Sequence, residues 1–196
     1  LRQTRHSLHG DTAHGYDATG RIERSTRQPF AGHSTAPSEA FQYDPAGNIT
    51  QAKATLAGGT VDNQCFGYDY QQQLTEAWTP NSADCDPSAR SQASLGGPAP
   101  YWTSWTTDTI GKTSKRVDRT PSAASTTTYD HASNGDGVAR PHFVTGTTTT
   151  GSAPGSASYA ADAAGNTTAR PAPGGGTETE PPRHVRRIRT LATPES

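Results

Sequence analysis

Aromatic and polar residues alternate along short stretches of this chain, and each stretch leads to a position just ahead of an Asp. Phe41 with Tyr43 is one such pair, and Phe66 with Tyr68 is another. A period of two is typical of a half-buried β-strand, because successive side chains of a strand point to opposite faces. No stretch of comparable length shows a 3.6-residue apolar period, so we expect little helix. The residues two positions before the end of each expected strand are Phe41, Phe66, Trp105 and Tyr159.

A turn motif of the form Tyr-Asp-x-x-Gly follows these strands. Asp at the first position of a type I turn accepts a hydrogen bond from the backbone two residues on, and Gly at the fourth position supplies positive φ at little cost. β-Branched residues after the Gly favour a returning strand, so each copy predicts a β-hairpin. The motif positions are Tyr16, Asp17 and Gly20; Tyr43, Asp44, Gly47 and Asn48; Tyr68 and Asp69; Asp108 and Gly111; and Asp162, Gly165 and Asn166.

The copies differ in quality. Thr107 and Ala161 replace the Tyr in two of them, Gln72 stands where Gly is expected after Asp69, and Tyr129 with Asp130 forms a sixth, partial copy. The Asp residues could be interpreted as catalytic carboxylates or metal ligands. However, a turn needs an Asp in every repeat, whereas an active site needs one unique constellation, so we assign them to turns.

The rest of the chain is organised around this repeat region. We expect an N-terminal edge segment at 1–13, a YD-repeat β region at 14–170 with motifs near 16, 43, 68, 107, 129 and 161, and a tail at 171–196 that is disordered or outside the repeat. Stretches rich in Pro, Gly, Ser and Ala at 82–100 and 152–158 are expected to be long loops.

In these motifs the chain resembles the RHS or YD-repeat family, whose repeat is Tyr-Asp-x-x-Gly followed by Asn or Arg, an aliphatic residue and Thr. The stretch from Cys65 to Trp105 resembles the version found in large exported proteins of actinobacteria. The resemblance implies an all-β fold in which β-hairpins form part of a spiral β-sheet shell wall. It also implies a non-enzymatic fragment whose partners are neighbouring repeats of a longer chain and an enclosed C-terminal toxin. The implied location is extracellular or at the cell surface.

Composition limits the other classes of function. Lys and Arg number 17 against 18 Asp and Glu, so there is no chain-wide basic footprint for nucleic acid, and no apolar run approaches the ~20 residues of a membrane helix. The seven His residues are scattered, and neither a Cys-x-x-Cys pair nor a nucleophile or phosphate-binding motif is present, so we expect no catalytic residue, no metal and no cofactor. Hydrophobic residues make up 30% of the chain, which predicts a thin core and weak, non-cooperative unfolding.

Two further groups of residues leave alternatives open. Cys65 and Cys85 form a disulfide if the protein is exported, as the resemblance implies, and are otherwise free thiols. Tyr101, Trp102 and Trp105 could stack against sugars, which would make the chain an extracellular carbohydrate-binding or adhesive module, although inward packing in a wall explains them more simply.

Overall fold

The computed structural model describes residues 3–5, 12–27, 37–56, 58–132, 140, 142–172 and 176–179. The described residues contain antiparallel β-strands, turns and two short 3-10 helices, so the predicted all-β class is confirmed. The chain divides into two compact units. The first comprises Leu1–Thr128 and Thr149–Pro154, and the second comprises Tyr129–Thr148 and Gly155–Ser196.

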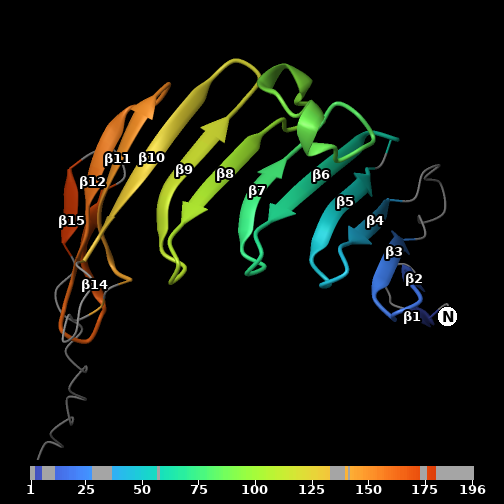
Figure 1. The fold of residues 1–196 in the computed structure, drawn as a ribbon, viewed down its shortest axis with the longest axis horizontal. Helices are drawn as coiled ribbons and strands as arrows, with labels where there is room; N and C mark the ends of the chain where they lie inside the picture. Colours follow the sequence, from blue (N-terminus) through green and yellow to red (C-terminus); the bar gives the residue numbers. More distant parts are fainter. Residues whose placement is uncertain are drawn as a thin grey trace, which may run out of the picture. The chain divides into compact units, whose positions relative to one another are not determined.

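The strands of the first unit form an open, single-layered sheet in which each strand pairs with its neighbour in sequence (Figure 1). This order continues along the chain to β12, and β13, β14 and β15 form a separate small sheet. The strands are β1 (Gln3–Arg5), β2 (Thr12–Tyr16), β3 (Ile22–Arg27), β4 (Ser38–Tyr43), β5 (Ile49–Thr55), β6 (Val61–Tyr68), β7 (Leu74–Trp78), β8 (Trp102–Thr107), β9 (Thr113–Arg119), β10 (Ala124–His131), β11 (Val144–Gly151), β12 (Gly155–Ser158), β13 (Ala160–Ala161), β14 (Thr167–Pro171) and β15 (Thr177–Thr179).

The turns of four hairpins of the first unit lie side by side at the same end of the strands (Figure 1). These hairpins are β2 with β3, β4 with β5, β6 with β7 and β8 with β9. In each hairpin the pairing register shifts by one residue immediately before the turn, at the strand residue that precedes the Asp. An extra residue of this kind increases the local twist, and its repetition gives every hairpin the same geometry.

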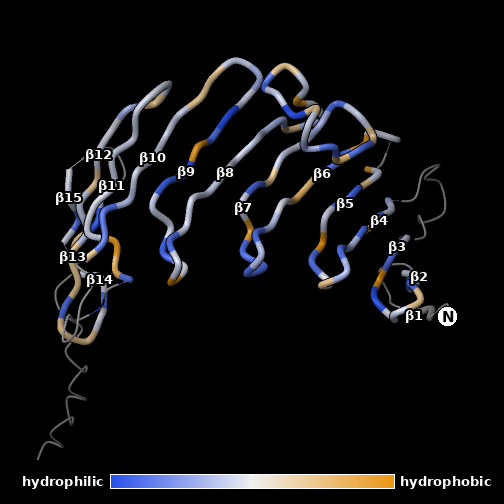
Figure 2. The backbone as a smooth tube through the Cα atoms, viewed as in Figure 1, coloured by the Kyte–Doolittle hydropathy of each residue, from blue (hydrophilic) through white to orange (hydrophobic). Residues whose placement is uncertain are grey.

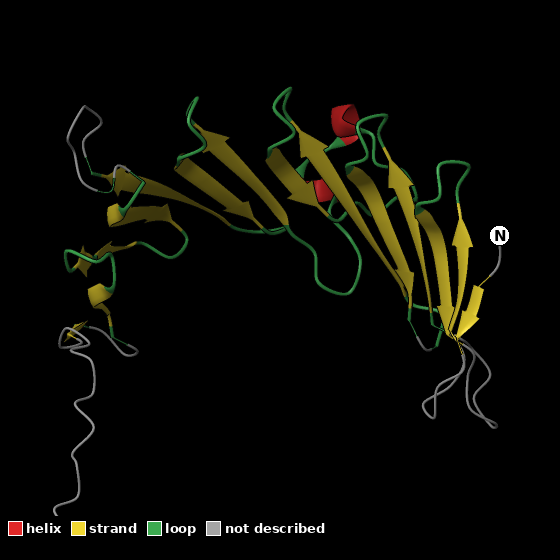
Figure 3. Ribbon diagram, turned by 90° about the horizontal axis from the view of Figure 1, so that it is seen from below, coloured by secondary structure: helices red, strands yellow, loops and turns green. Residues whose placement is uncertain are grey.

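The two faces of this sheet differ. The connection from β7 to β8 (79–101) carries the short helices η1 (Pro87–Ala89) and η2 (Gln92–Ser94), which are the helical segments of the described residues (Figure 3). Cys85 and Leu95 of this connection pack against Cys65, Trp78 and Trp102. These three are register partners across β6, β7 and β8, so their side chains share a face, which we call the loop face. The other side is called the open face.

The hydrophobic core is small. Its buried hydrophobic residues in the described part of the chain are Cys65, Ala77, Trp78 and Leu95. Figure 2 shows the hydrophobic positions as short, separate stretches along a backbone that is mostly hydrophilic or neutral. The sheet is therefore held together mainly by its hydrogen-bond ladders and by contacts between adjacent hairpins.

Three expectations about local structure need correction. Residues 155–158 form β12 although they were expected to be a loop. Residues 177–179 of the tail, which was expected to be disordered or outside the repeat, form β15 and pair with β14, so this segment is ordered. Tyr129 and Asp130 lie within β10, which continues to His131, so no reversal begins at Asp130. Residues 180–196 of the expected tail lie outside the described residues, and the expected boundary between 13 and 14 falls inside β2.

Candidate functional site

The first turn shows what the repeated Asp does. The backbone N–H of Asp17 donates to the carbonyl of Arg21 at 2.9 Å, and the N–H of Gly20 donates back to the carbonyl of Asp17 at 3.1 Å. One carboxylate oxygen, Oδ1 of Asp17, accepts from the backbone N–H groups of both Thr19 and Arg21 at 2.9 Å. Gly20 has a φ of 87°, the left-handed conformation that closes the loop. One side chain thus organises a five-residue loop.

Four further turns repeat this arrangement. In each, the N–H four residues after the Asp donates to Oδ1 at 2.9 to 3.0 Å, and the fourth residue of the turn, counted from the Asp, has positive φ. The Asp residues are Asp44, Asp69, Asp108 and Asp162, and the residues with positive φ are Gly47, Gln72, Gly111 and Gly165. Gln72 adopts a φ of 63°, so the hydrogen bonds to Asp69 hold the same turn although Gly is absent at this position.

The hydrogen bonds within the turns set the ionisation of these carboxyls. The Thr19 hydroxyl, followed by the backbone and side chain of Arg21, holds the pKa of Asp17 well below its usual range. The side-chain amide of Asn48 does the same for the pKa of Asp44, and that of Asn166 lowers the pKa of Asp162. Donors that bond the charged form favour it, so these groups stay ionised as acceptors for the backbone.

The repeated Tyr joins two of the hairpins to the hairpins before them. The hydroxyl of Tyr43 donates to the carbonyl oxygen of Ile22 at 2.7 Å, and the hydroxyl of Tyr68 donates to that of Ile49 at 2.9 Å. Both acceptors are the aliphatic residue that follows the preceding turn. The Tyr therefore has a role between hairpins that the strand pattern did not predict, although its recurrence as Tyr rather than Phe is a signal of a needed hydroxyl.

Side chains that follow the turn Gly add to this contact. The Arg21 guanidinium lies 4.5 Å from the centre of the Tyr43 ring, and its Nη1 donates to the carbonyl of Asp44 at 3.3 Å. The first and second hairpins are consequently connected through their turns as well as through the β3–β4 ladder.

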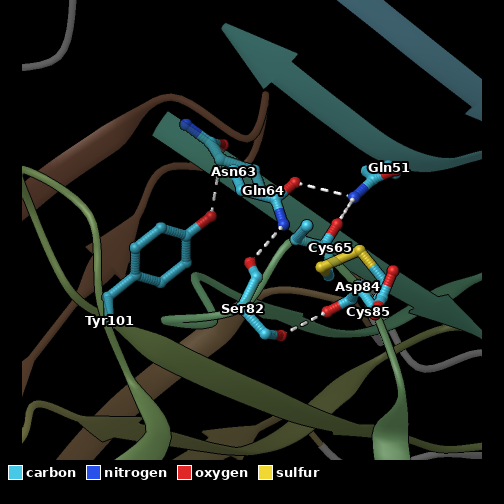
Figure 4. Close-up of a disulfide and its surroundings, with 9 residues drawn as sticks. Gln51, Asn63, Gln64, Cys65, Ser82, Asp84, Cys85 and Tyr101 are labelled. Atoms are coloured by element: carbon cyan, nitrogen blue, oxygen red, sulfur yellow. Dashed lines mark hydrogen bonds between the residues drawn. A yellow bond between two sulfur atoms is a disulfide. The ribbon is translucent and has the colours of Figure 1, made fainter. Parts of the chain in front are cut away.

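The connection from β7 to β8 is fixed to the loop face by a disulfide between Cys65 and Cys85. Around it, amide side chains of the sheet hold the backbone of the connection (Figure 4). Nε2 of Gln51 donates to the carbonyl of Ala83 at 2.8 Å and to Oδ1 of Asn63 at 2.8 Å, while Nδ2 of Asn63 donates to the carbonyl of Ser82 at 3.1 Å. Gln51 and Asn63 are both buried, so these bonds satisfy groups that would otherwise be costly to bury.

Arg90 fixes the far part of the same connection. Its guanidinium pairs with the Glu76 carboxylate at 2.6 Å and lies 4.9 Å from the ring centres of both Trp78 and Trp102. Arg119 lies 3.9 Å from the ring centre of Trp102. No motif in the sequence indicated this cluster, because its members are brought together only by the register of β7, β8 and β9 and by the path of the connection.

The three aromatic residues considered for sugar stacking do not all lie on one face of the sheet. Trp102 belongs to the stack with Arg90 on the loop face, whereas Trp105, three residues further along β8, points to the open face. The hydroxyl of Tyr101 donates to Oε1 of Gln64 at 3.3 Å. The structure therefore places Trp102 on the face opposite to Tyr101 and Trp105, so the three side chains do not form one platform.

The described residues contain neither a metal-binding cluster nor a membrane-spanning helix. Within them, no group of three or more His, Cys, Asp or Glu side chains is placed to hold a metal ion. The same residues include no helix that is long and apolar enough to cross a membrane.

Comparison with known proteins adds little to this geometry. No protein-family model matches the chain, and no curated protein matches it. Among solved structures, the chain is similar to a porin-like protein from Bacteroides uniformis, with 10% identity over 86% of each chain and a TM-score of 0.36.

Proposed function

We propose that this chain is a non-enzymatic scaffold, a section of a YD-repeat wall that adjoins further hairpins of the same kind in an exported protein. The observation that carries the proposal is the pair of hydroxyls, of Tyr43 and Tyr68, that bond two successive hairpins to their predecessors. A contact that uses the same residue of successive hairpins can be extended indefinitely, as in other repeat proteins, in which each unit is stabilised by its neighbours.

The thin core supports the same proposal. A sheet that exposes one face and buries few apolar side chains is only weakly stable on its own. Its stability increases when flanking hairpins pair with its edge strands. The role proposed for the complete wall is to enclose or present a C-terminal toxin domain of the same polypeptide, at the cell surface or outside the cell.

Limited proteolysis of a longer product tests the proposal. The chain is expressed together with the coding sequence on either side, and digestion of the downstream domain is compared with digestion of that domain alone. Protection that disappears when turn residues such as Asp44 and Asp69 are both changed to Asn supports enclosure. Equal digestion in both contexts, or flanking sequence without further Tyr-Asp-x-x-Gly copies, refutes it.

A further inference from the structure

The cluster of Arg and Trp side chains on the loop face has one cation more than it has carboxylates. Arg90 is paired with the Glu76 carboxylate, so these two charges compensate each other. Arg119 belongs to the same cluster, because its guanidinium lies 3.9 Å from the centre of the Trp102 ring. Nη1 of Arg119 donates to the hydroxyl of Ser104 at 3.0 Å, and Arg119 forms no ion pair with any residue that the structure describes. No described carboxylate therefore contacts this guanidinium.

The remaining charged residues of β9 are divided between the two faces. Asp118, the acidic residue of this strand, points to the open face, where it accepts from Nε of Arg116 at 2.7 Å and from the hydroxyl of Thr103 at 3.0 Å. Lys115 points to the loop face, as Arg119 does, and it forms no ion pair within the described part of the chain. On β9 the loop face thus carries two cations without a carboxylate partner.

Loss of hydration makes the missing partner of Arg119 more important. Burial is the largest of the causes that act on the pKa of Arg119, and it lowers that pKa. Glu76 and Asp118 act in the opposite direction, whereas the like charge of Arg90 adds to the lowering. Because the net pKa still lies below its usual range, the described carboxylates do not compensate for the lost hydration. A partly desolvated cation of this kind is stabilised by a ligand of opposite charge.

Two buried N–H groups in the cluster also favour such a ligand. Nε of Arg90 and Nε1 of Trp102 are buried, and neither has a hydrogen-bond acceptor among the described residues. The guanidinium of Arg90 lies 4.9 Å from the centre of the Trp102 ring, so both groups belong to the site that includes Arg119. Buried polar groups are almost always hydrogen-bonded, and N–H dipoles without an acceptor increase the positive potential around them.

The side of Arg119 that faces away from Trp102 is open. Its register partner on that side is Ala124 of β10, an exposed residue whose side chain is a single methyl group. The β7–β8 connection borders the site near the end of β9, where Nε2 of Gln92 donates to the carbonyls of Thr120 and Ala123 at 2.8 and 3.1 Å. A small ion can therefore reach the guanidinium over Ala124 and lie beside the connection.

We infer that Arg119, with Trp102 and Arg90 beside it, binds a small doubly charged oxoanion, inorganic phosphate or sulfate. A planar guanidinium presents parallel N–H donors that match two oxygens of such an anion. The double negative charge is attracted by Arg119 and by Lys115 on the same face. A water molecule satisfies N–H groups equally well, but it leaves the charge of Arg119 without a partner. The site does not depend on the proposed wall, so the failure of either leaves the other standing.

Nuclear magnetic resonance of the full ¹⁵N-labelled chain tests the inference, because indole N–H groups give separate signals. Sulfate, phosphate and acetate are each titrated in exchange for sodium chloride, at constant ionic strength and mildly alkaline pH. We expect the Trp102 signal to shift saturably with sulfate and phosphate, and acetate, with its single charge, to bind about tenfold more weakly. The signal of Trp105, on the open face of the same strand, should stay in place.

Three results of these titrations would overturn the inference. Absence of a saturable shift with both sulfate and phosphate shows that the N–H groups are satisfied by water alone. An equal response to further sodium chloride shows that the shift reports ionic strength. Acetate that binds as tightly as sulfate contradicts the assignment to a doubly charged oxoanion.

Variants of β9 locate the site. Arg119→Gln should raise the dissociation constant for sulfate about tenfold or more, since it removes the charge and the guanidinium donors. The matched control is Arg116→Gln, which removes the same charge from the open face of the same strand and should change the constant less than about twofold. Equal effects of the two variants show that sulfate responds to the overall charge of the chain, and they refute the site.

A second variant of the same residue separates charge from donor geometry. Arg119→Lys keeps the charge but lacks the planar pair of donors, so it should weaken sulfate binding about threefold to tenfold. Circular dichroism and mass measurement of the disulfide show whether each variant is folded. Undiminished sulfate binding by a folded Arg119→Gln or Arg119→Lys variant overturns the assignment of Arg119.

Discussion

Removal of the Tyr hydroxyls that connect successive hairpins should loosen the sheet locally. Tyr43→Phe removes the donor to the Ile22 carbonyl, and Tyr68→Phe removes the donor to the Ile49 carbonyl, while each ring stays in place. Burial, and then the charge of Asp44, raises the pKa of Tyr68, so its hydroxyl remains a donor at neutral pH. The perturbation is therefore one hydrogen bond per variant.

The magnitude follows from the cost of one neutral hydrogen bond. Such a bond contributes about 0.5 to 1.5 kcal/mol, which corresponds to about 2- to 13-fold in a local opening equilibrium. Hydrogen exchange measured by mass spectrometry reports this opening for individual strands. For Tyr43→Phe we expect faster exchange in peptides covering β3 and β4, and for Tyr68→Phe in those covering β5 and β6.

Tyr70 provides the control. It lies at the apex of the β6–β7 turn and is 89% exposed, so Tyr70→Phe removes a hydroxyl that contributes nothing to the contact between hairpins. Unchanged exchange in Tyr43→Phe and Tyr68→Phe, or an equal effect of Tyr70→Phe, would show that the hydroxyls do not connect the hairpins.

Four other outcomes are expected. Gln72→Gly should stabilise the β6–β7 hairpin by about 0.5 kcal/mol in denaturant titration, because the strain of a non-Gly residue at positive φ outweighs the entropy that Gly adds to the unfolded chain. Gly47→Gln should destabilise the β4–β5 hairpin for the same reason. Destabilisation by Gln72→Gly together with stabilisation by Gly47→Gln would contradict the turn assignment. Reduction of the disulfide between Cys65 and Cys85 should cost about 3 kcal/mol, and alkylation of two thiols in oxidised protein would disprove the bond. Because the pKa of Asp17 is lowered on folding, its stabilising contribution should be complete above about pH 4 and lost as pH falls further, and Asp17→Asn should flatten that acid dependence. Thermal unfolding should be broad, and a sharp two-state transition would show that the small core is more cohesive than its composition suggests.

The turns could be read from the sequence because their chemistry is local. Asp17 and Gly20 determine the loop between them within five residues, and the structure places that loop where the motif occurs. Tyr129 and Asp130 show the limit of such reading. The dipeptide is present, but no Gly follows Asp130 at the fourth position, and the strand continues through it.

Strands without a hydrophobic period could not be predicted. Residues 155–158 and 177–179 are rich in Gly, Ser and Thr and carry no alternating pattern, yet each pairs with a neighbouring strand. These segments become strands because their backbones hydrogen-bond to an edge strand that is already formed. Side-chain composition carries no signal of such pairing.

The β7–β8 connection could be recognised only as a loop rich in Pro, Gly and Ser. Its interior depends on pairs distant in sequence, such as Gln51 with Ala83 and Arg90 with Glu76. Neither pair has a spacing or motif of its own, because the sheet register decides which side chains lie beneath the connection. Contacts of this kind become visible only in three dimensions.

The repeated and the varied positions of the hairpins therefore serve different purposes. The Asp and the residue with positive φ recur because each of these hairpins needs the same turn. Tyr43 and Tyr68 add a contact with the preceding hairpin, and the polar atoms of these side chains are occupied by those contacts. Arg24, Gln42 and Lys53 do not recur in the motif, and they lie on a face where Gly15 and Ala40 leave space. The recurring side chains are committed to the geometry of the array, whereas the varied positions on the faces of the sheet are free of that constraint and can differ from hairpin to hairpin.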